Sequence, residues 1–115
     1  MVGPYVPDAG DLVWLDFDQQ AGREQAGRRP AVVLSARYFN DKTGVAYVCP
    51  ITSKVKGYRF HVLLPEGLPV HGSVLCEHMR SLDWRARNAT PMGKLPGTIL
   101  KEVRAAVRTL AGIPH

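Results

Sequence analysis

Residues 22–35 read GREQAGRRPAVVLS, a polar loop flanked by glycines that runs directly into a short apolar segment. Gly22 and Gly27 permit backbone conformations that other residues avoid. Pro30 fixes its own φ and restricts Arg29 to extended geometry. The apolar run at residues 31–34 predicts a strand in the core of a sheet. We therefore expect Arg29 at the mouth of a rigid strand, where its guanidinium is preorganised to meet developing negative charge.

The segments on either side of this stretch predict further strands. Residues 10–17, GDLVWLDF, carry apolar side chains at both alternating positions, which indicates a strand buried on both faces. Residues 58–64 alternate in polarity, as a half-exposed strand does. Pro, Gly, Asn and Asp mark the breaks between strands. In full, we expect strands at 10–17, 29–36, 45–51 and 58–64, one or two short strands within 73–83, loops at 18–27 and 65–72, and a turn at 40–44.

The C-terminal segment changes its hydrophobic period. Ile99, Leu100, Val103, Val107 and Leu110 recur at helical spacing. A helix is therefore predicted near residues 98–111, with Thr98 as its N-cap and with Gly112 and Pro114 to end it. Many short strands followed by one helix predict a mainly β fold, a small β-barrel or curled sheet closed by a C-terminal helix.

Length and composition predict one domain over residues 1–115, with no linker or repeat. No apolar run approaches the roughly 20 residues that span a bilayer. The start of the chain lacks the charged and apolar regions of a signal peptide, so we expect a cytoplasmic protein. Cys49 and Cys76 fit a reducing compartment as two free thiols, with a disulfide between them as the alternative.

Positive charge is concentrated after residue 24. The formal net charge is +5, and the segment from Gln25 onward holds fourteen of the fifteen Lys and Arg residues against five Asp and Glu. Such an asymmetry indicates a surface that faces a polyanion such as nucleic acid. The alternative is a solvated charged surface without a partner.

Specific motifs support the nucleic-acid interpretation. The pattern Glu-Gln-x-Gly-x-Arg-Pro at residues 24–30, after Gly-Asp-Leu-Val-Trp at 10–14, resembles the MazF/PemK family of toxin endoribonucleases from type II toxin–antitoxin systems. The likeness continues through PITS at 50–53 and SLDWRAR at 81–87, and it runs from Tyr5 to about Leu110. The resemblance implies an SH3-like small β-barrel that forms a homodimer. It also implies sequence-specific cleavage of single-stranded RNA, messenger RNA included, without a metal or other cofactor, and hence inhibition of translation and growth.

RNA can be cut by its own 2′-hydroxyl, which attacks the adjacent phosphate and leaves a 2′,3′-cyclic phosphate and a 5′-hydroxyl. A protein that aligns this attack needs a cation for the phosphorane and groups that move protons. The resemblance assigns to Arg29 the stabilisation of the transition state, with proton donation as a second role. It assigns a phosphate hydrogen bond to Thr52, and activity in some members to Glu24, a candidate general base. Each residue also has a structural interpretation: an ion pair for Arg29, turn hydrogen bonds for Thr52, and loop ordering for Glu24.

Further residues are candidates for substrate binding. Basic side chains can contact backbone phosphates, and Tyr58 can stack on an unpaired base. His78 stands where glutamine is common in the resembled family, which leaves its role open between RNA contact and a dimer interface. The full set is Gln25, Arg28, Ser53, Lys54, Lys56, Tyr58, Glu77, His78, Arg80 and Arg87.

Histidines offer a second chemistry. An imidazole can act as acid or base near neutral pH, so His61, His71 and His78 are candidates for proton transfer. His71, Cys76 and His78 form a loose cluster, but its spacing matches none of the strong zinc patterns, and we expect no metal site.

The resemblance also implies partners and alternatives. It implies an antitoxin whose acidic segment covers the RNA channel, with DNA bound indirectly through that antitoxin, and no membrane. One alternative is a non-enzymatic toxin of the same fold, like the gyrase poisons, although the loop at 24–30 argues against it. The other alternative is an RNA binder that has lost catalysis, which retention of Arg29 and Thr52 disfavours.

Overall fold

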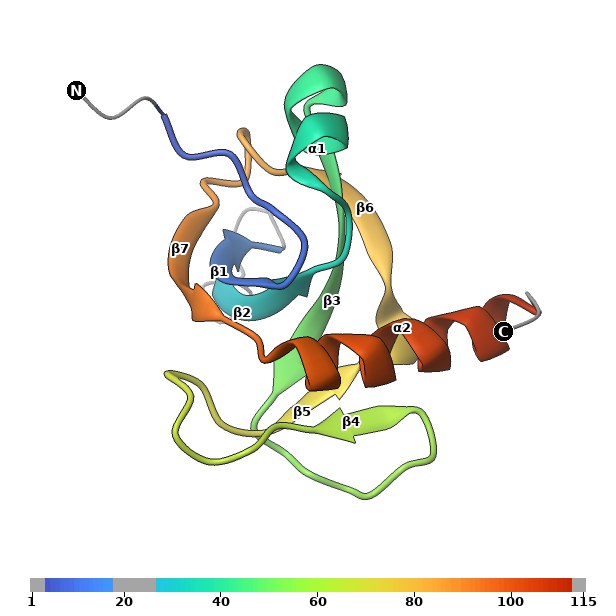
Figure 1. Ribbon diagram of the computed structural model, residues 1–115. Coiled ribbons are helices and arrows are strands. Elements are labelled where there is room, and N and C mark those ends of the chain that lie inside the picture. Colours follow the sequence, from blue (N-terminus) through green and yellow to red (C-terminus); the bar gives the residue numbers. More distant parts are fainter. Residues whose placement is uncertain (1–3, 18–26, 113–115) are drawn as a thin grey trace.

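The computed structural model describes residues 4–17 and 27–112, in which an antiparallel sheet curls around a core and helix α2 lies across it (Figure 1). The predicted mainly β fold with a C-terminal helix is confirmed. The elements are β1 Asp11–Asp16, β2 Arg28–Val33, α1 Arg37–Thr43, β3 Val45–Thr52, β4 His61–Leu63, β5 Ser73–Leu75, the 3-10 helix η2 Cys76–His78, β6 Arg80–Asp83, β7 Thr90–Lys94 and α2 Gly97–Ala111.

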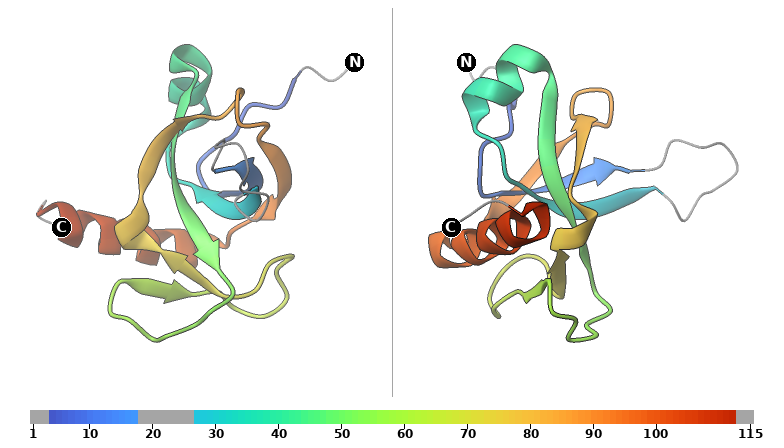
Figure 2. Two further views of the ribbon diagram at one scale, coloured as in Figure 1. Left: turned by 180° about the vertical axis from the view of Figure 1, so that it is seen from behind. Right: turned by 90° about the vertical axis from the view of Figure 1, so that its right-hand side faces the viewer.

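Strand β3 organises the sheet, because it pairs with three other strands. Its first half pairs with β6 and its middle with β2, while its last residues pair with β5. The order is β4-β5-β3-β2-β1-β7, with β6 also on β3, and every pair is antiparallel. Both views of Figure 2 show β3 as the long central strand of the curl. Among the described strands, no ladder joins β7 to β4 or β6, so the sheet is barrel-like without closing.

The curl has two apolar cores, one on each face of β1. Leu12 packs with Val32, Cys49 and Val74 against α2, whereas Val13 and Leu15 point to the opposite face, towards Trp84. The prediction that this strand is buried on both faces is therefore confirmed in part, because Leu12, Val13 and Leu15 are buried but Trp14 is 39% exposed. The two cysteines are free and buried in the first core, as expected. The Cys49–Cys76 hydrogen bond, together with burial, raises the pKa of the Cys49 thiol.

Helix α2 covers the first core with most of the face that the sequence predicted, although Leu110 at its end is 41% exposed. Val103 is fully buried, and Ile99, Leu100 and Val107 pack around it. The predicted N-cap was wrong: the helix begins at Gly97, and the carbonyl of Pro96 accepts the first N–H bonds, so Thr98 lies inside the first turn. Gly112 ends the helix in the left-handed region (φ 74°), as predicted. No helix in the described ranges is long and apolar enough to cross a membrane.

The predicted turn at 40–44 was wrong in part, because residues 37–43 form helix α1. Its cap comes from far away in the sequence: the Asp8 carboxylate accepts the Arg37 backbone N–H (2.8 Å), and the Arg37 guanidinium lies 3.8 Å from it. These contacts, first the hydrogen bond from the Arg37 backbone, lower the pKa of Asp8. Gly44 then ends α1 in the left-handed region.

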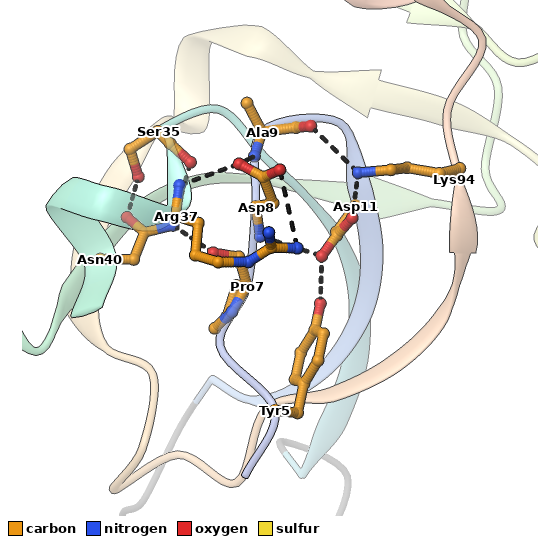
Figure 3. Close-up of polar contacts among 9 residues, drawn as sticks. All are labelled: Tyr5, Pro7, Asp8, Ala9, Asp11, Ser35, Arg37, Asn40 and Lys94. Carbon is orange, nitrogen blue, oxygen red and sulfur yellow. Dashed lines mark hydrogen bonds and ion pairs between the residues drawn. The ribbon is translucent and has the colours of Figure 1, made fainter. Parts of the chain in front are cut away.

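Asn40 joins α1 to the rest of the fold (Figure 3). Its side chain is fully buried and donates to the carbonyls of Pro7 (2.8 Å) and Ser35 (2.9 Å). The backbone carbonyl of Asn40 accepts the indole N–H of Trp84 (2.9 Å). Beside it, Asp11 accepts hydrogen bonds from Tyr5 and Lys94. Buried hydrogen bonds of Asn40 thus join the N-terminal segment, α1 and the turn after β6, and the part-buried contacts of Asp11 lie beside them.

Three strands differ from the prediction. Strand β2 ends at Val33, before the predicted end at residue 36, because the chain bends into α1. Strand β4 covers three residues of the predicted segment 58–64, since residues 59–60 form a turn. Strand β7 was not predicted, because Pro91 and Gly93 are residue types that are uncommon inside strands. Pro91 is tolerated because β7 pairs with β1 alone among the described strands.

Gly72 brings the loop before β5 against the end of β3. Its φ of +124° is a conformation that L side chains rarely adopt, and a Cβ built there would lie 1.9 Å from the carbonyl oxygen of Thr52. The Gly72 carbonyl also accepts the N–H of Leu64 (2.9 Å). A residue with a side chain cannot occupy this position without moving one of the two segments.

We expect Asn40→Leu to lower the free energy of unfolding by about 2–4 kcal/mol, because it keeps the volume but leaves buried carbonyls unpaired. Urea denaturation measures the change. Asp41→Ala, on the exposed side of the same helix, is the control and should change the free energy by less than about 0.5 kcal/mol. Equal stability of Asn40→Leu and the parent would contradict the role given to this network.

We expect Gly72→Ala to destabilise the protein more than Gly67→Ala. Both glycines have positive φ, but a Cβ at Gly67 meets no atom within 4 Å. Gly67→Ala therefore carries the backbone cost of about 1 kcal/mol, while Gly72→Ala adds an overpacking cost of about 1–3 kcal/mol. Thermal and urea unfolding of the two variants measure the difference, and equal losses would show that the Thr52 contact is not restrictive.

Candidate functional site

A cleft of about 480 Å³ opens where β2 begins and β3 ends. Three segments line it: the start of β2, the end of β3 with the residues after it, and the loop before β5. The lining residues are Arg29, Pro30, Ile51, Thr52, Ser53, Lys54, Pro69, Val70 and His71. Four of the predicted site residues, Arg29, Thr52, Ser53 and Lys54, therefore come together here.

Strand register explains why Arg29 and Thr52 meet. Ala31 and Pro50 form the last pair of the β2–β3 ladder, and Arg29 and Thr52 each lie two residues beyond it, where the two strands open into the cleft. Arg29 is also paired with Leu15 of β1, so its backbone is held inside the sheet while its side chain is exposed. Thr52 pairs with Ser73 of β5 on its other side. The sheet thus fixes both residues on neighbouring strands.

The cleft carries positive charge and hydroxyl groups. Arg29 and Lys54 supply the basic side chains, and Thr52 and Ser53 supply hydroxyls. Arg29 makes no ion pair with any carboxylate in the described ranges, and no carboxylate lines the cleft there. The hydroxyl oxygen of Thr52 accepts the Lys54 backbone N–H (3.2 Å), which orders the turn and leaves the hydroxyl proton to donate. This set of groups suits an anion with several oxygens, such as a phosphodiester.

Two other predicted residues, Arg28 and Arg87, brace the end of β1 outside the cleft. Arg28 pairs with Asp16 (3.0 Å) and also donates to the Asn88 carbonyl and to Thr90. Arg87 donates to the backbone carbonyls of Asp16 and Phe17. Hydrogen bonds from Asn88 and then Arg28 lower the pKa of Asp16. Since neighbouring residues of a strand point to opposite faces, Arg28 and Arg29 have different environments.

A second group of predicted residues gathers around His61. The imidazole Nε2 of His61 lies 2.8 Å from a Glu77 oxygen, and the rings of Tyr58 and His61 are 5.0 Å apart. Burial raises the pKa of Glu77, but hydrogen bonds from its own backbone N–H and from His61 outweigh it, so the pKa is lowered. His78 is exposed and lies 3.9 Å from the same carboxylate oxygen. This group ties the segment after β3 to η2.

The remaining predicted residues are placed as follows. The Arg80 guanidinium stacks over the Phe17 ring at 5.6 Å, at the start of β6. Lys56 is exposed in the segment between β3 and β4. Glu24 and Gln25 lie outside the described residues.

The structure adds His71 to the cleft, a residue that the sequence offered only as one of three histidines. Nothing in the spacing linked residue 71 to residues 29 and 52, since the chain returns to β3 through the β4–β5 pair. The weak signal was the His71-Gly72 pair directly before a predicted strand, which indicates a tight entry into the sheet.

Comparison with known proteins agrees with this geometry. A family model described as PemK-like, MazF-like toxin of type II toxin-antitoxin system matches residues 8–111. The endoribonuclease toxin MazF of Escherichia coli K12 is 46% identical over 112 residues, covering 97% of this chain and 100% of that protein. The E. coli endoribonuclease toxin ChpB is 37% identical over 101 residues, covering 83% of this chain and 85% of ChpB.

Solved structures give the same result. The crystal structure of MazF (Form-I) from Deinococcus radiodurans superposes with a TM-score of 0.88 at 54% identity, covering 96% of this chain and 100% of that one. A MazE–MazF crystal structure (Form-III) from the same organism gives a TM-score of 0.89 at 52% identity, with the same coverage. The chain therefore belongs to the PemK-like, MazF-like toxin family of type II toxin–antitoxin systems, as the motif at residues 24–30 predicted.

Proposed function

We propose that this chain is a toxin that cuts single-stranded RNA internally at specific sequences, without a metal ion. The observation that carries the proposal is the cleft in which Arg29, Thr52 and Lys54 converge, with no carboxylate among its described lining residues. Relatives that are 46% and 37% identical are named endoribonucleases, which supports RNA as the substrate.

The reaction needs no external nucleophile. The 2′-hydroxyl oxygen forms a bond to the adjacent phosphorus as the bond from phosphorus to the 5′-oxygen breaks. The products are a 2′,3′-cyclic phosphate and a 5′-hydroxyl. The planar guanidinium of Arg29 donates two parallel hydrogen bonds to the non-bridging oxygens, whose negative charge grows in the phosphorane. The Thr52 hydroxyl donates to the same phosphate, and Lys54 adds a nearby cation. Glu24, outside the described residues, stays a prediction for the base that takes the 2′-hydroxyl proton.

The RNA strand follows the exposed segment beyond the cleft. Lys54 and Lys56 contact flanking phosphates, and Tyr58, which is 57% exposed, stacks on a base. Glu77 and His78 offer hydrogen-bonding groups to base edges next to it, and Gln25 and Ser53 do so near the scissile phosphate. Arg28, Arg80 and Arg87 add positive charge from the end of β1 and the start of β6. Base-edge contacts of this kind give sequence preference, while the phosphate contacts give affinity.

In the cell, we place this activity in the cytoplasm, where cleavage of messenger RNA inhibits translation and growth. The active form is a homodimer, and an antitoxin with an acidic segment covers the positive cleft. Crystal structures of MazE–MazF complexes at about half sequence identity support such a partner. Charge complementarity favours an acidic segment over a neutral one. DNA is contacted indirectly, through the antitoxin.

We expect the purified chain to cut a long single-stranded RNA in excess EDTA and to leave 5′-hydroxyl and cyclic-phosphate ends, which end-group analysis detects. Arg29→Ala should fold normally but cleave about 10²–10³-fold more slowly, as loss of a transition-state donor does. Arg108→Ala, which removes an exposed cation of α2, is the matched control and should cleave as the parent does.

Cleavage by Arg29→Ala at the parental rate would disprove the mechanism. No cleavage by a folded parent would disprove the nuclease proposal itself. Gyrase-dependent DNA breaks would then identify a gyrase poison, while RNA retention without new 5′-hydroxyl ends would identify a binder without catalysis.

We expect light scattering to give twice the chain mass of 12.7 kDa.

A synthetic acidic segment of the cognate antitoxin should inhibit cleavage, and added salt should weaken this inhibition because it screens the charges. A segment of the same composition in scrambled order is the control. A monomer that cleaves at full rate would contradict the dimer proposal, and inhibition independent of salt would contradict the electrostatic one.

A further inference from the structure

We propose that His71 is the general acid of the cleavage, the residue that gives a proton to the leaving 5′-oxygen. This inference rests on the proposed nuclease function and adds a residue to it. His71 lines the cleft together with Arg29 and Thr52, on the side formed by the loop before β5.

The backbone on both sides of His71 is fixed. Before it, Val70 is 9% exposed and belongs to the core under α2. After it, Gly72 lies against the Thr52 carbonyl so closely that a Cβ would not fit, and its own carbonyl is bonded to Leu64. His71 is therefore an exposed residue of the cleft lining whose backbone is held beside the end of β3. A proton donor needs this combination of access and fixed position.

The chemistry of the other lining groups leaves proton donation to the imidazole. Arg29 holds its proton at any physiological pH, and the hydroxyls of Thr52 and Ser53 are very weak acids. Lys54 is a strongly hydrated cation suited to charge contacts. Histidine is the side chain that ordinarily gains and loses a proton between about pH 5 and 8. Among the described residues that line the cleft, His71 is the only histidine.

The other two described histidines, His61 and His78, lie beside Glu77 and outside the cleft. His61 is bound to Glu77 and its side chain is 6% exposed, whereas His78 faces solvent beside the same carboxylate. Neither lines the cleft. The charged groups that face His71 in the described part of the cleft are Arg29 from β2 and Lys54 after β3. A bound phosphodiester supplies the negative charge opposite all three.

The proton balance is complete. The 2′-hydroxyl proton leaves to the base, the bond from the 2′-oxygen to phosphorus forms, and the bond from phosphorus to the 5′-oxygen breaks. The His71 imidazolium transfers its proton to that 5′-oxygen and becomes neutral. It regains a proton from water before the next turnover.

The test compares two substrates that differ in the leaving group. One is an RNA with the cleavage motif of the parent enzyme, and the other carries a bridging 5′-sulfur at the scissile position, since a thiolate leaves without a proton. His71→Gln should lower kcat on the oxygen substrate by about 10²–10⁴-fold, the contribution of a general acid. It should cleave the sulfur substrate at nearly the parental rate.

Glu66→Gln, in an exposed position of the same loop, is the control and should match the parent on both substrates. Circular dichroism and thermal unfolding confirm that each variant folds. An equal loss of His71→Gln on both substrates, or no loss on either, would overturn the role of His71 while the nuclease proposal stands. A folded parent that cuts neither substrate would overturn both.

Discussion

The antiparallel register of β3 is the constraint on which the rest of the structure depends. One continuous strand pairs with β6, β2 and β5 in turn, so a single set of hydrogen-bond ladders fixes the curl and the cleft. A shift of one residue would exchange the faces of every side chain on the strand. It would carry Thr52 away from Arg29 and expose the apolar residues of two cores. Selection for a packed core therefore also maintains the geometry of the cleft.

The basic residues are of two kinds, those held by contacts within the fold and those that line the cleft. Arg28, Arg87 and Lys94 also support the fold, because each is held by a carboxylate or a backbone carbonyl of the first strand or the turn before it. Arg29 and Lys54 line the cleft and have no carboxylate partner within the described ranges. Asp16 pairs with Arg28 and Asp11 pairs with Lys94, which offsets part of the positive charge of the first kind. Positive potential therefore remains at the cleft, where β2 begins and β3 ends. The net charge of the chain alone would not indicate this location.

Elements whose structure is decided by a local pattern were predicted from the sequence, and those decided by distant residues were not. Alternation at residues 10–17 and helical spacing from Ile99 to Leu110 predicted β1 and α2, and the Arg-Pro pair predicted an arginine fixed by a strand. Two elements and one site residue depend on contacts between residues that are far apart in the sequence, and these were not predicted. Helix α1 is capped by Asp8, which is 29 residues from Arg37, and β7 is held by pairing with β1 despite its Pro and Gly. His71 reaches the cleft through a chain reversal that no local spacing records.

Gly72 connects the stability of the fold to the chemistry of the cleft. Its missing side chain lets the loop before β5 approach the Thr52 carbonyl, and its positive φ turns the chain into β5 immediately afterwards. Both features cost conformational freedom on folding, because glycine loses more of it than any other residue. The burial of Val70 and Val74, on either side of the glycine, offsets this cost. The apolar core that α2 covers therefore holds His71 against the end of β3, although no residue of the helix lines the cleft.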